Sequence, residues 1–219
     1  KGGVSKNRIM RDPAFARTRE NMSEFSSNAR AAKLMRLAVN ELLQRAKDNR
    51  LTSRLTKMMS TIQKFDTTSV RGKRNVAVGI QDPEAMALMD NFNFNIRAHL
   101  SSILQAVYSV DTATGEIAIP AFVPDRDLIS PEGATHLSLQ GGYVKVDFGT
   151  GAYTSNLSNI ENLVLDTTET NVSLVPDEVP GGSGTVFILL LIEFFQEVNG
   201  VQYGLRNGAF NSLCIVATA

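Results

Sequence analysis

The residue types that support catalysis or metal binding are few and scattered in this chain of 219 residues. It has one cysteine, Cys214, and two histidines, His99 and His136, which fall in different predicted elements. Zinc sites draw their ligands mainly from Cys and His, and this supply is too small for one. Cys214 lies in an apolar segment and is predicted to be a core thiol, and His136 a surface residue on a strand. We expect no metal site.

Other segments resemble catalytic or ligand-binding motifs only superficially. Gly181–Gly184 lacks the Lys-Ser/Thr that follows a phosphate loop and precedes a predicted strand instead of a helix. Asp125–Asp127, and Asp111 with Glu116, hold too few carboxylates at recognised spacing for a hard cation, so solvated turns are predicted. No Gly-x-Ser-x-Gly elbow, Walker loop or dinucleotide fingerprint occurs. The expected protein is therefore non-enzymatic, with no catalytic residue and no cofactor.

The distribution of charge is more informative than the net charge of zero. Residues 1–74 hold 18 of the 22 Lys and Arg but 6 of the 22 Asp and Glu, which leaves them at +12 and residues 75–219 at −12. Such asymmetry suggests an interaction surface. Its basic side chains form a candidate surface made of Arg45, Lys47, Arg50, Arg54, Lys57, Arg71, Lys73 and Arg74.

Three interpretations of this basic surface remain open. Phosphate groups of a nucleic acid need little more than a high density of Lys and Arg, although the segment has no helix-turn-helix spacing and no interleaved aromatic residues for base stacking. The basic half of one copy could instead dock on the acidic half of the next, which would build a ring or a filament. The third interpretation is that the basic residues form a solvated helical face without a partner.

The first 98 residues are predicted to be a basic helical region with a flexible arm at residues 1–3. Asp12-Pro13 marks a helix start, and Ser26-Ser27-Asn28 is expected to interrupt the helix that follows. Further helices are predicted from the spacing of their apolar residues and from the signal Asp82-Pro83. The expected helices are 13–25, 29–47, a third stretch from Leu51 to about Phe65, and 82–90.

Residues 99–219 are predicted to form an antiparallel β-sandwich, because apolar residues alternate there with period 2. Thr112–Gly115 is expected to turn a hairpin, and the strand around Val144 to have one wet face. Asn199-Gly200 and Asn207-Gly208 each favour a tight turn. They predict a closing meander of strands 185–198, 201–206 and 209–218, and the whole chain is expected to have an α+β fold.

One predicted strand is apolar on both faces. Its second face carries Phe187, Leu189, Leu191 and Phe195, interrupted only by Glu193. A sandwich strand normally has one polar face, so either the chain's own helices or another subunit should cover this one. The strictly apolar run, Val186–Ile192, is far shorter than a membrane span requires.

The N-terminal segment contains a run of residues at Lys1–Ser5 and Arg8–Phe25, which continues through Ala32–Leu34, Asn49-Arg50, Thr52–Lys57 and Arg71-Gly72. On these residues the chain resembles a family of uncharacterised Bacteroidetes proteins. The resemblance covers about the first 75 residues and is looser beyond. It implies a short basic leader before the equivalent of Lys1, so that this chain would begin inside its gene product, and it implies no activity.

Together these patterns favour a self-assembling structural subunit of a filament, tube or virion-like particle, held by contacts between its own copies of opposite charge. The charge split, the doubly apolar strand and an N-terminal arm able to reach a neighbour motivate this hypothesis. The alternatives are a nucleic-acid-associated accessory protein that binds through the basic helices, and a sandwich module that binds carbohydrate or protein. The compartment stays open, with cytoplasmic synthesis and release as an extracellular assembly among the options.

Overall fold

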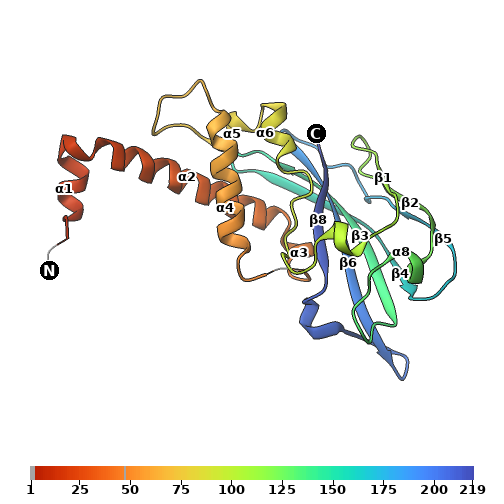
Figure 1. The fold of residues 1–219 in the computed structure, drawn as a ribbon. Helices are drawn as coiled ribbons and strands as arrows, with labels where there is room; N and C mark the ends of the chain where they lie inside the picture. Colours follow the sequence, from red (N-terminus) through yellow and green to blue (C-terminus); the bar gives the residue numbers. More distant parts are fainter. Residues whose placement is uncertain (1–2, 47) are drawn as a thin grey trace.

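The computed structural model describes residues 3–46 and 48–219, without the side chains of residues 206 and 207, and has the predicted α+β fold (Figure 1). Helices occupy the N-terminal half and antiparallel strands the C-terminal half. The helices are α1 (Lys6–Arg11), α2 (Ala16–Ala38), α3 (Asn40–Leu43), α4 (Leu51–Ile62), α5 (Val76–Gly79), α6 (Pro83–Ala87), α7 (Leu100–Ile103) and α8 (Pro124–Asp127), with 3-10 turns η1 (Pro13–Phe15), η2 (Gln63–Phe65) and η3 (Leu205–Gly208). The strands are β1 (Ser109–Val110), β2 (Ile117–Phe122), β3 (His136–Val146), β4 (Tyr153–Val164), β5 (Thr170–Leu174), β6 (Thr185–Val198), β7 (Val201–Gly204) and β8 (Ser212–Thr218).

Helix α2 corrects one prediction. Ser26–Asn28 do not interrupt it, and the helix runs unbroken to Ala38. The buried Asn28 side chain donates a hydrogen bond to Gln63 Oε1 at 2.9 Å. Because the amide N–H group of Asn28 has this tertiary partner, it does not compete for the helix's own backbone carbonyl groups. The predicted starts are confirmed, since Asp12 and Asp82 cap the turns that begin at Pro13 and Pro83.

The strands form two sheets that face each other. The larger has the order β4-β3-β6-β7, with β8 also paired to β6, and the smaller has the order β1-β2-β5. Apolar side chains of the smaller sheet, among them Ile117, Ile119 and Leu174, pack against Leu137, Leu139 and Leu190 of the larger sheet. The predicted hairpin at Thr112–Gly115 joins β1 to β2. The strand β3 has no wet face, because Tyr143 is buried under the smaller sheet.

The end of the chain is not the simple meander that the two Asn-Gly pairs predict. Asn199 and Gly200 form the expected tight turn, with φ of 54° and 76°. Strand β7 then pairs only with the last residues of β6, and β8 pairs with Phe187–Ile192 on the same edge. The second Asn-Gly pair lies in η3 instead of a hairpin turn. The third strand therefore returns to β6 and not to β7.

Strand β6 is buried on both faces, as its sequence predicts. Phe187, Leu189 and Leu191 pack under the helices, together with Val144 and Leu213. The alternate residues of β6 face the smaller sheet. The chain's own helices thus cover the second face, which excludes a neighbouring subunit at these three residues, while Phe195 beyond them is half-buried. The predicted regions 1–98 and 99–219 consequently share one core at this face.

Backbone segments cover both long outer edges of the larger sheet. Residues 91–94 run along β8, where Asn91 N donates to Ile215 O and Phe94 N to Leu213 O, both at 2.8 Å. Residues 175–181 run along the first half of β4, where Asp177 N donates to Leu157 O at 3.1 Å. Part of the hydrogen-bonding capacity of these edges is therefore used within the chain.

Truncating either face of β6 should destabilise the protein equally severely. We expect Leu189→Ala and Leu190→Ala each to lower the free energy of unfolding by about 2–5 kcal/mol, because each leaves a cavity in a different layer. Val198→Ala, at the exposed end of the same strand, is the control and should change it by less than about 0.5 kcal/mol. Urea unfolding followed by circular dichroism suits a chain without Trp. A Leu189→Ala value near that of the control would contradict the packing of helices on this face.

Candidate functional site

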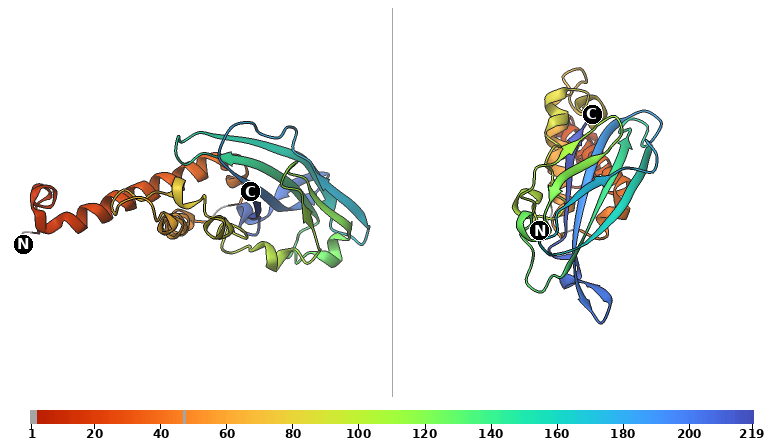
Figure 2. Two further views of the ribbon diagram at one scale, coloured as in Figure 1. Left: turned by 90° about the horizontal axis from the view of Figure 1, so that it is seen from above. Right: turned by 90° about the vertical axis from the view of Figure 1, so that its right-hand side faces the viewer.

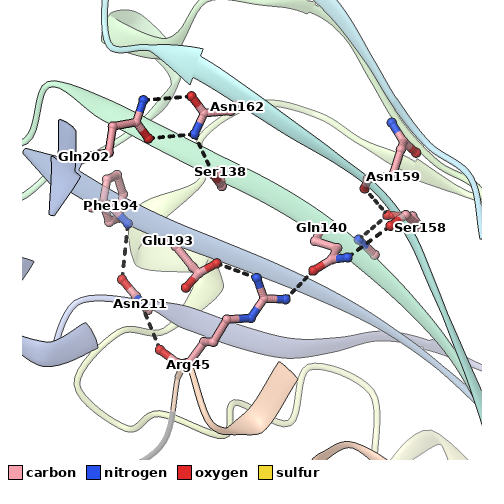
Figure 3. Close-up of polar contacts among 11 residues, drawn as sticks. Arg45, Ser138, Gln140, Ser158, Asn159, Asn162, Glu193, Phe194, Gln202 and Asn211 are labelled. Carbon is pink, nitrogen blue, oxygen red and sulfur yellow. Dashed lines mark hydrogen bonds and ion pairs between the residues drawn. The ribbon is translucent and has the colours of Figure 1, made fainter. Parts of the chain in front are cut away.

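The basic residues singled out from the sequence do not form one open surface. Arg45, just after α3, reaches across to the larger sheet (Figure 3). Its guanidinium donates to Glu193 Oε2 at 2.8 Å and to the Gln140 amide oxygen. Burial raises the pKa of the Glu193 carboxyl, and the Arg45 guanidinium offsets part of that rise. Arg45 is thus a link between the helical region and the sheet.

Around this ion pair lies a network of amide and hydroxyl groups on the helix-facing side of the larger sheet (Figure 3). Asn162 Nδ2 donates to Ser138 Oγ at 2.8 Å. Asn162 of β4 and Gln202 of β7 also exchange two hydrogen bonds of 3.0 Å, although β3 and β6 lie between their strands. This bridge requires a strongly curved sheet. The network places no nucleophile beside a general base, and its members serve one another as partners.

Arg54 is held equally firmly within the chain. It donates to Asp48 Oδ2 at 2.6 Å and to the carbonyl oxygens of Asn93 and Phe94 at 2.8 and 3.0 Å. Its guanidinium also lies over the Phe92 ring, 5.4 Å from the centroid. Burial alone would raise the pKa of Asp48, but hydrogen bonds from the backbone N–H groups of Ile96 and Arg50 and from Arg54 lower it. Arg54 therefore fixes the segment that leads from the helices to the strands.

Residues 66–75 form a brace against α2. Arg74 holds Glu24 with two hydrogen bonds of 2.9 Å, and the Gly72 N–H donates to the same carboxylate at 2.7 Å. The Arg74 guanidinium is the main cause that lowers the pKa of Glu24. Arg71 adds an ion pair to Glu20 at 3.3 Å.

Asp66 anchors the start of the brace. Its buried carboxylate accepts hydrogen bonds from the backbone N–H groups of Thr68, Ser69 and Asn75. Burial by itself would raise the pKa of Asp66, but hydrogen bonds from the Ser69 side chain, from the N–H groups of Ser69 and Asn75 and from the Thr68 side chain outweigh it and lower the pKa from 3.8 to about 2.

The eight candidate basic residues thus divide into groups with different roles. Four of them make ion pairs within the chain, and these are Arg45, Arg54, Arg71 and Arg74. Arg50, Lys57 and Lys73 are exposed and take part in none of the ion pairs found among the described residues. Lys47 lies outside the described residues. The sequence missed this division because the acidic partners are distant along the chain, apart from Asp48.

The prominent feature that the sequence did not predict is a helical arm, residues 3–23. It comprises α1, η1 and the first eight residues of α2, it projects away from the body (Figure 2), and it contains no buried residue. Only residues 1–3 are predicted as an arm, because the following sequence is helix-forming. The sequence does contain one indication that this helix projects without packing on the body, because residues 16–27 have no apolar stripe.

The helical arm has a defined structure of its own. Arg19 donates to the carbonyl oxygens of Ile9 and Asp12 at 2.7 and 2.9 Å, which folds α1 back onto the start of α2. Arg8 lies over the Phe15 ring, 5.9 Å from its centroid. Met10 and Met22 are 53% and 52% exposed, and Phe25 just beyond is 66% exposed. The helical arm thus offers apolar side chains among basic ones.

A groove of about 690 Å³ lies between α2, α5 and the turn after β3. Leu34, Leu37 and Phe148 line it, with Arg30 and Lys33 beside them. These side chains include no His, Cys or carboxylate. The groove could hold an apolar or anionic group, but nothing in it would activate one chemically.

The sequence-based expectations for other titratable residues are partly corrected. Cys214 is buried as predicted, and burial raises its pKa to about 12, which suppresses the thiolate. His136 is half-buried beside Glu197, at 3.3 Å, and is not a freely exposed residue. Asp127 is buried and held by Arg126, so Asp125–Asp127 is not a solvated turn throughout. Asp111 accepts the Ala113 N–H in an exposed turn.

Among the described residues, no three His, Cys, Asp or Glu side chains are grouped so that they could hold a metal ion. No helix formed by these residues has the length and apolar character that crossing a membrane requires.

Comparisons of the chain with protein-family models, with curated proteins and with solved structures find no match. Its candidate function is therefore argued from its own residues.

A matched pair of substitutions separates structural from surface arginines. Arg54→Ala leaves the buried Asp48 carboxylate with its backbone N–H donors but without its cationic partner, and it removes the Arg54 hydrogen bonds to two carbonyl groups. We therefore expect a loss of about 2–4 kcal/mol in the free energy of unfolding. Arg50→Ala, four residues away on an exposed position, should cost less than about 0.5 kcal/mol. Urea unfolding of both variants checks this, and equal values would mean that Arg54 does not hold the structure as its contacts indicate.

The brace should weaken in acid. Because the pKa of Asp66 in the folded chain lies below its ordinary value of 3.8, the ionised form stabilises folding above about pH 4, and this contribution is lost as the pH falls towards 2. Asp66→Asn should cost about 1–3 kcal/mol at pH 7, and its difference from the native chain should shrink below pH 4. Thermal unfolding at several pH values measures this. Glu41→Gln is the control, because it removes one negative charge at pH 7 from an exposed position. A pH-independent difference would contradict the assignment.

Proposed function

We propose that the protein is a non-enzymatic, self-assembling structural subunit in which the helical arm of one copy packs on the next copy. The observation that carries the proposal is the arm itself, because it has a fixed structure, projects from the body and buries no residue in its own chain (Figure 2).

The physical argument is that such an arm lacks the usual source of helix stability. Isolated helices of this length are marginal in water, and helices in proteins are stabilised mainly by packing an apolar face. The first turns of α2 have no such packing, yet the brace fixes the helix where it leaves the body, through Glu20 and Glu24. Packing on a second copy would bury Met10, Met22 and Phe25 and supply the missing stabilisation.

The distribution of charge also supports a second copy of the chain as the partner of the arm. Residues 3–23 contain five basic and two acidic side chains, whereas residues 75–219 carry a net charge of −12. Opposite charges on one chain favour docking between copies and speed their encounter. The nucleic-acid alternative has less support, since half of its candidate residues are held in ion pairs within the chain. The sandwich-module alternative, the Bacteroidetes resemblance and the compartment stay predictions.

The test is the mass of the particle in solution. We expect light scattering on a sizing column to show an oligomer at low salt that shifts to smaller species at high salt. Lys6→Glu with Arg11→Glu, both exposed on α1, should abolish the oligomer, because the substitutions reverse the charge of the arm.

The control for this variant has the same change in charge elsewhere. Arg50→Glu with Lys57→Glu, on the exposed side of α4 and its start, should leave the oligomer intact. A native chain that is monomeric at both salt concentrations would overturn the proposal. A high ratio of absorbance at 260 nm to 280 nm that falls with salt would favour the nucleic-acid alternative instead.

A further inference from the structure

A part of the larger sheet is left uncovered at the end far from the helical arm. It lies on the same face that the helices cover around Leu191, beyond the point where Arg45 meets Glu193. The strand register places one row of side chains from each strand on this face. We call it the distal sheet face, and its residues are His136, Ile160, Val164, Phe195, Glu197 and Gln202.

The distal sheet face is apolar on the side of β4, and hydrogen bonds across it hold its side chains in place. Ile160 and Val164 of β4 are 53% and 50% exposed. Phe195 of β6, which His136 of β3 separates from Val164, is half-buried. The hydrogen bonds between Asn162 and Gln202 span the face from β4 to β7 (Figure 3). Such a surface offers apolar contacts without having to become ordered on binding, which lowers the entropic cost of association.

The charge of this region is opposite to that of the helical arm. Residues 129–204 contain nine acidic residues and one basic residue, Lys145. On the distal sheet face itself Glu197 is exposed and lies 3.3 Å from His136, while Glu193 beside it is already paired with Arg45. The groove lined by Arg30 and Lys33 has the same sign of charge as the arm, and a basic arm would be repelled there.

The positions of the two surfaces also fit a repeating contact. The helical arm lies at one end of the molecule, and the β6–β7 hairpin that borders the distal sheet face lies at the other (Figure 1). A contact between different surfaces at opposite ends leaves one arm and one face free after each addition. Repetition then gives an open filament or, if the rotation closes, a ring.

We infer that the distal sheet face is the acceptor for the helical arm of a second copy of this chain. Apolar side chains of the arm would lie against Ile160, Val164 and Phe195, and its basic side chains would face Glu197. This inference rests on the proposed function and adds the place where the arm docks.

The decisive experiment mixes two variants that are each defective in one surface. Ile160→Lys with Val164→Lys places two charges on the distal sheet face at exposed positions, and we expect it to abolish the oligomer. Lys6→Glu with Arg11→Glu abolishes it from the side of the arm. Mixed in equal amounts, the two variants should form a dimer that grows no further, because each supplies the surface that the other lacks.

Val198→Lys with Val201→Lys is the matched control. These two residues pair with each other in the β6–β7 hairpin, point to the opposite side of the sheet and are 48% and 49% exposed. This variant should assemble like the native chain. Circular dichroism and the melting temperature of all variants establish that each is folded before its mass is measured.

The light-scattering results distinguish the inferred acceptor surface from the proposed function. An acceptor variant that still assembles, while the arm variant does not, would overturn this inference and leave the proposed function standing. Folded variants that are both monomeric and fail to dimerise when mixed would also overturn it. A native chain that is monomeric would overturn both the inference and the proposed function.

Discussion

The architecture depends on a strand that must be kept from water on both sides. From Val186 to Phe194 every residue of β6 is buried, including Glu193. At about 25 cal/mol per Å² of apolar surface, neither face of such a strand can be left exposed cheaply. The smaller sheet covers one face and the helices cover the other. The sandwich therefore requires the helical region, and the burial of β6 fixes where the helices lie.

The few acidic residues of the basic half determine what its many basic residues do. Glu20, Glu24 and Asp48 each engage an arginine, and in doing so they orient α2, the brace and the chain that leads to the strands. Arg45 is the exception that pairs with the acidic half, through Glu193. The opposite charges of the two halves therefore remain largely unpaired with each other inside the molecule, since Arg45–Glu193 is the one ion pair found between the halves among the described residues.

Features that depend on neighbouring residues could be predicted from the sequence, and features that depend on distant partners could not. The extent of β6, the caps at Asp12 and Asp82 and the turn at Asn199-Gly200 are local, and the structure confirms them. The continuity of α2 through Asn28 depends on Gln63, and the path of β8 depends on how β7 ends. The candidate site was the least predictable part, because a helix that buries no residue has the same local sequence preferences as one that is packed.

The covered edges of the larger sheet have a consequence for how copies of this chain behave at high concentration. An open strand edge invites a neighbour to add its own strand, which is the usual route to irreversible aggregates. Here residues 91–94 occupy part of the β8 edge with backbone hydrogen bonds, and residues 175–181 line the first half of β4 with one backbone hydrogen bond and with bonds from the Thr154 and Asn156 side chains. Where these segments lie, crowded molecules meet through side chains, whose contacts respond to salt and pH. Association of that kind stays reversible and can be dissolved without unfolding the chain.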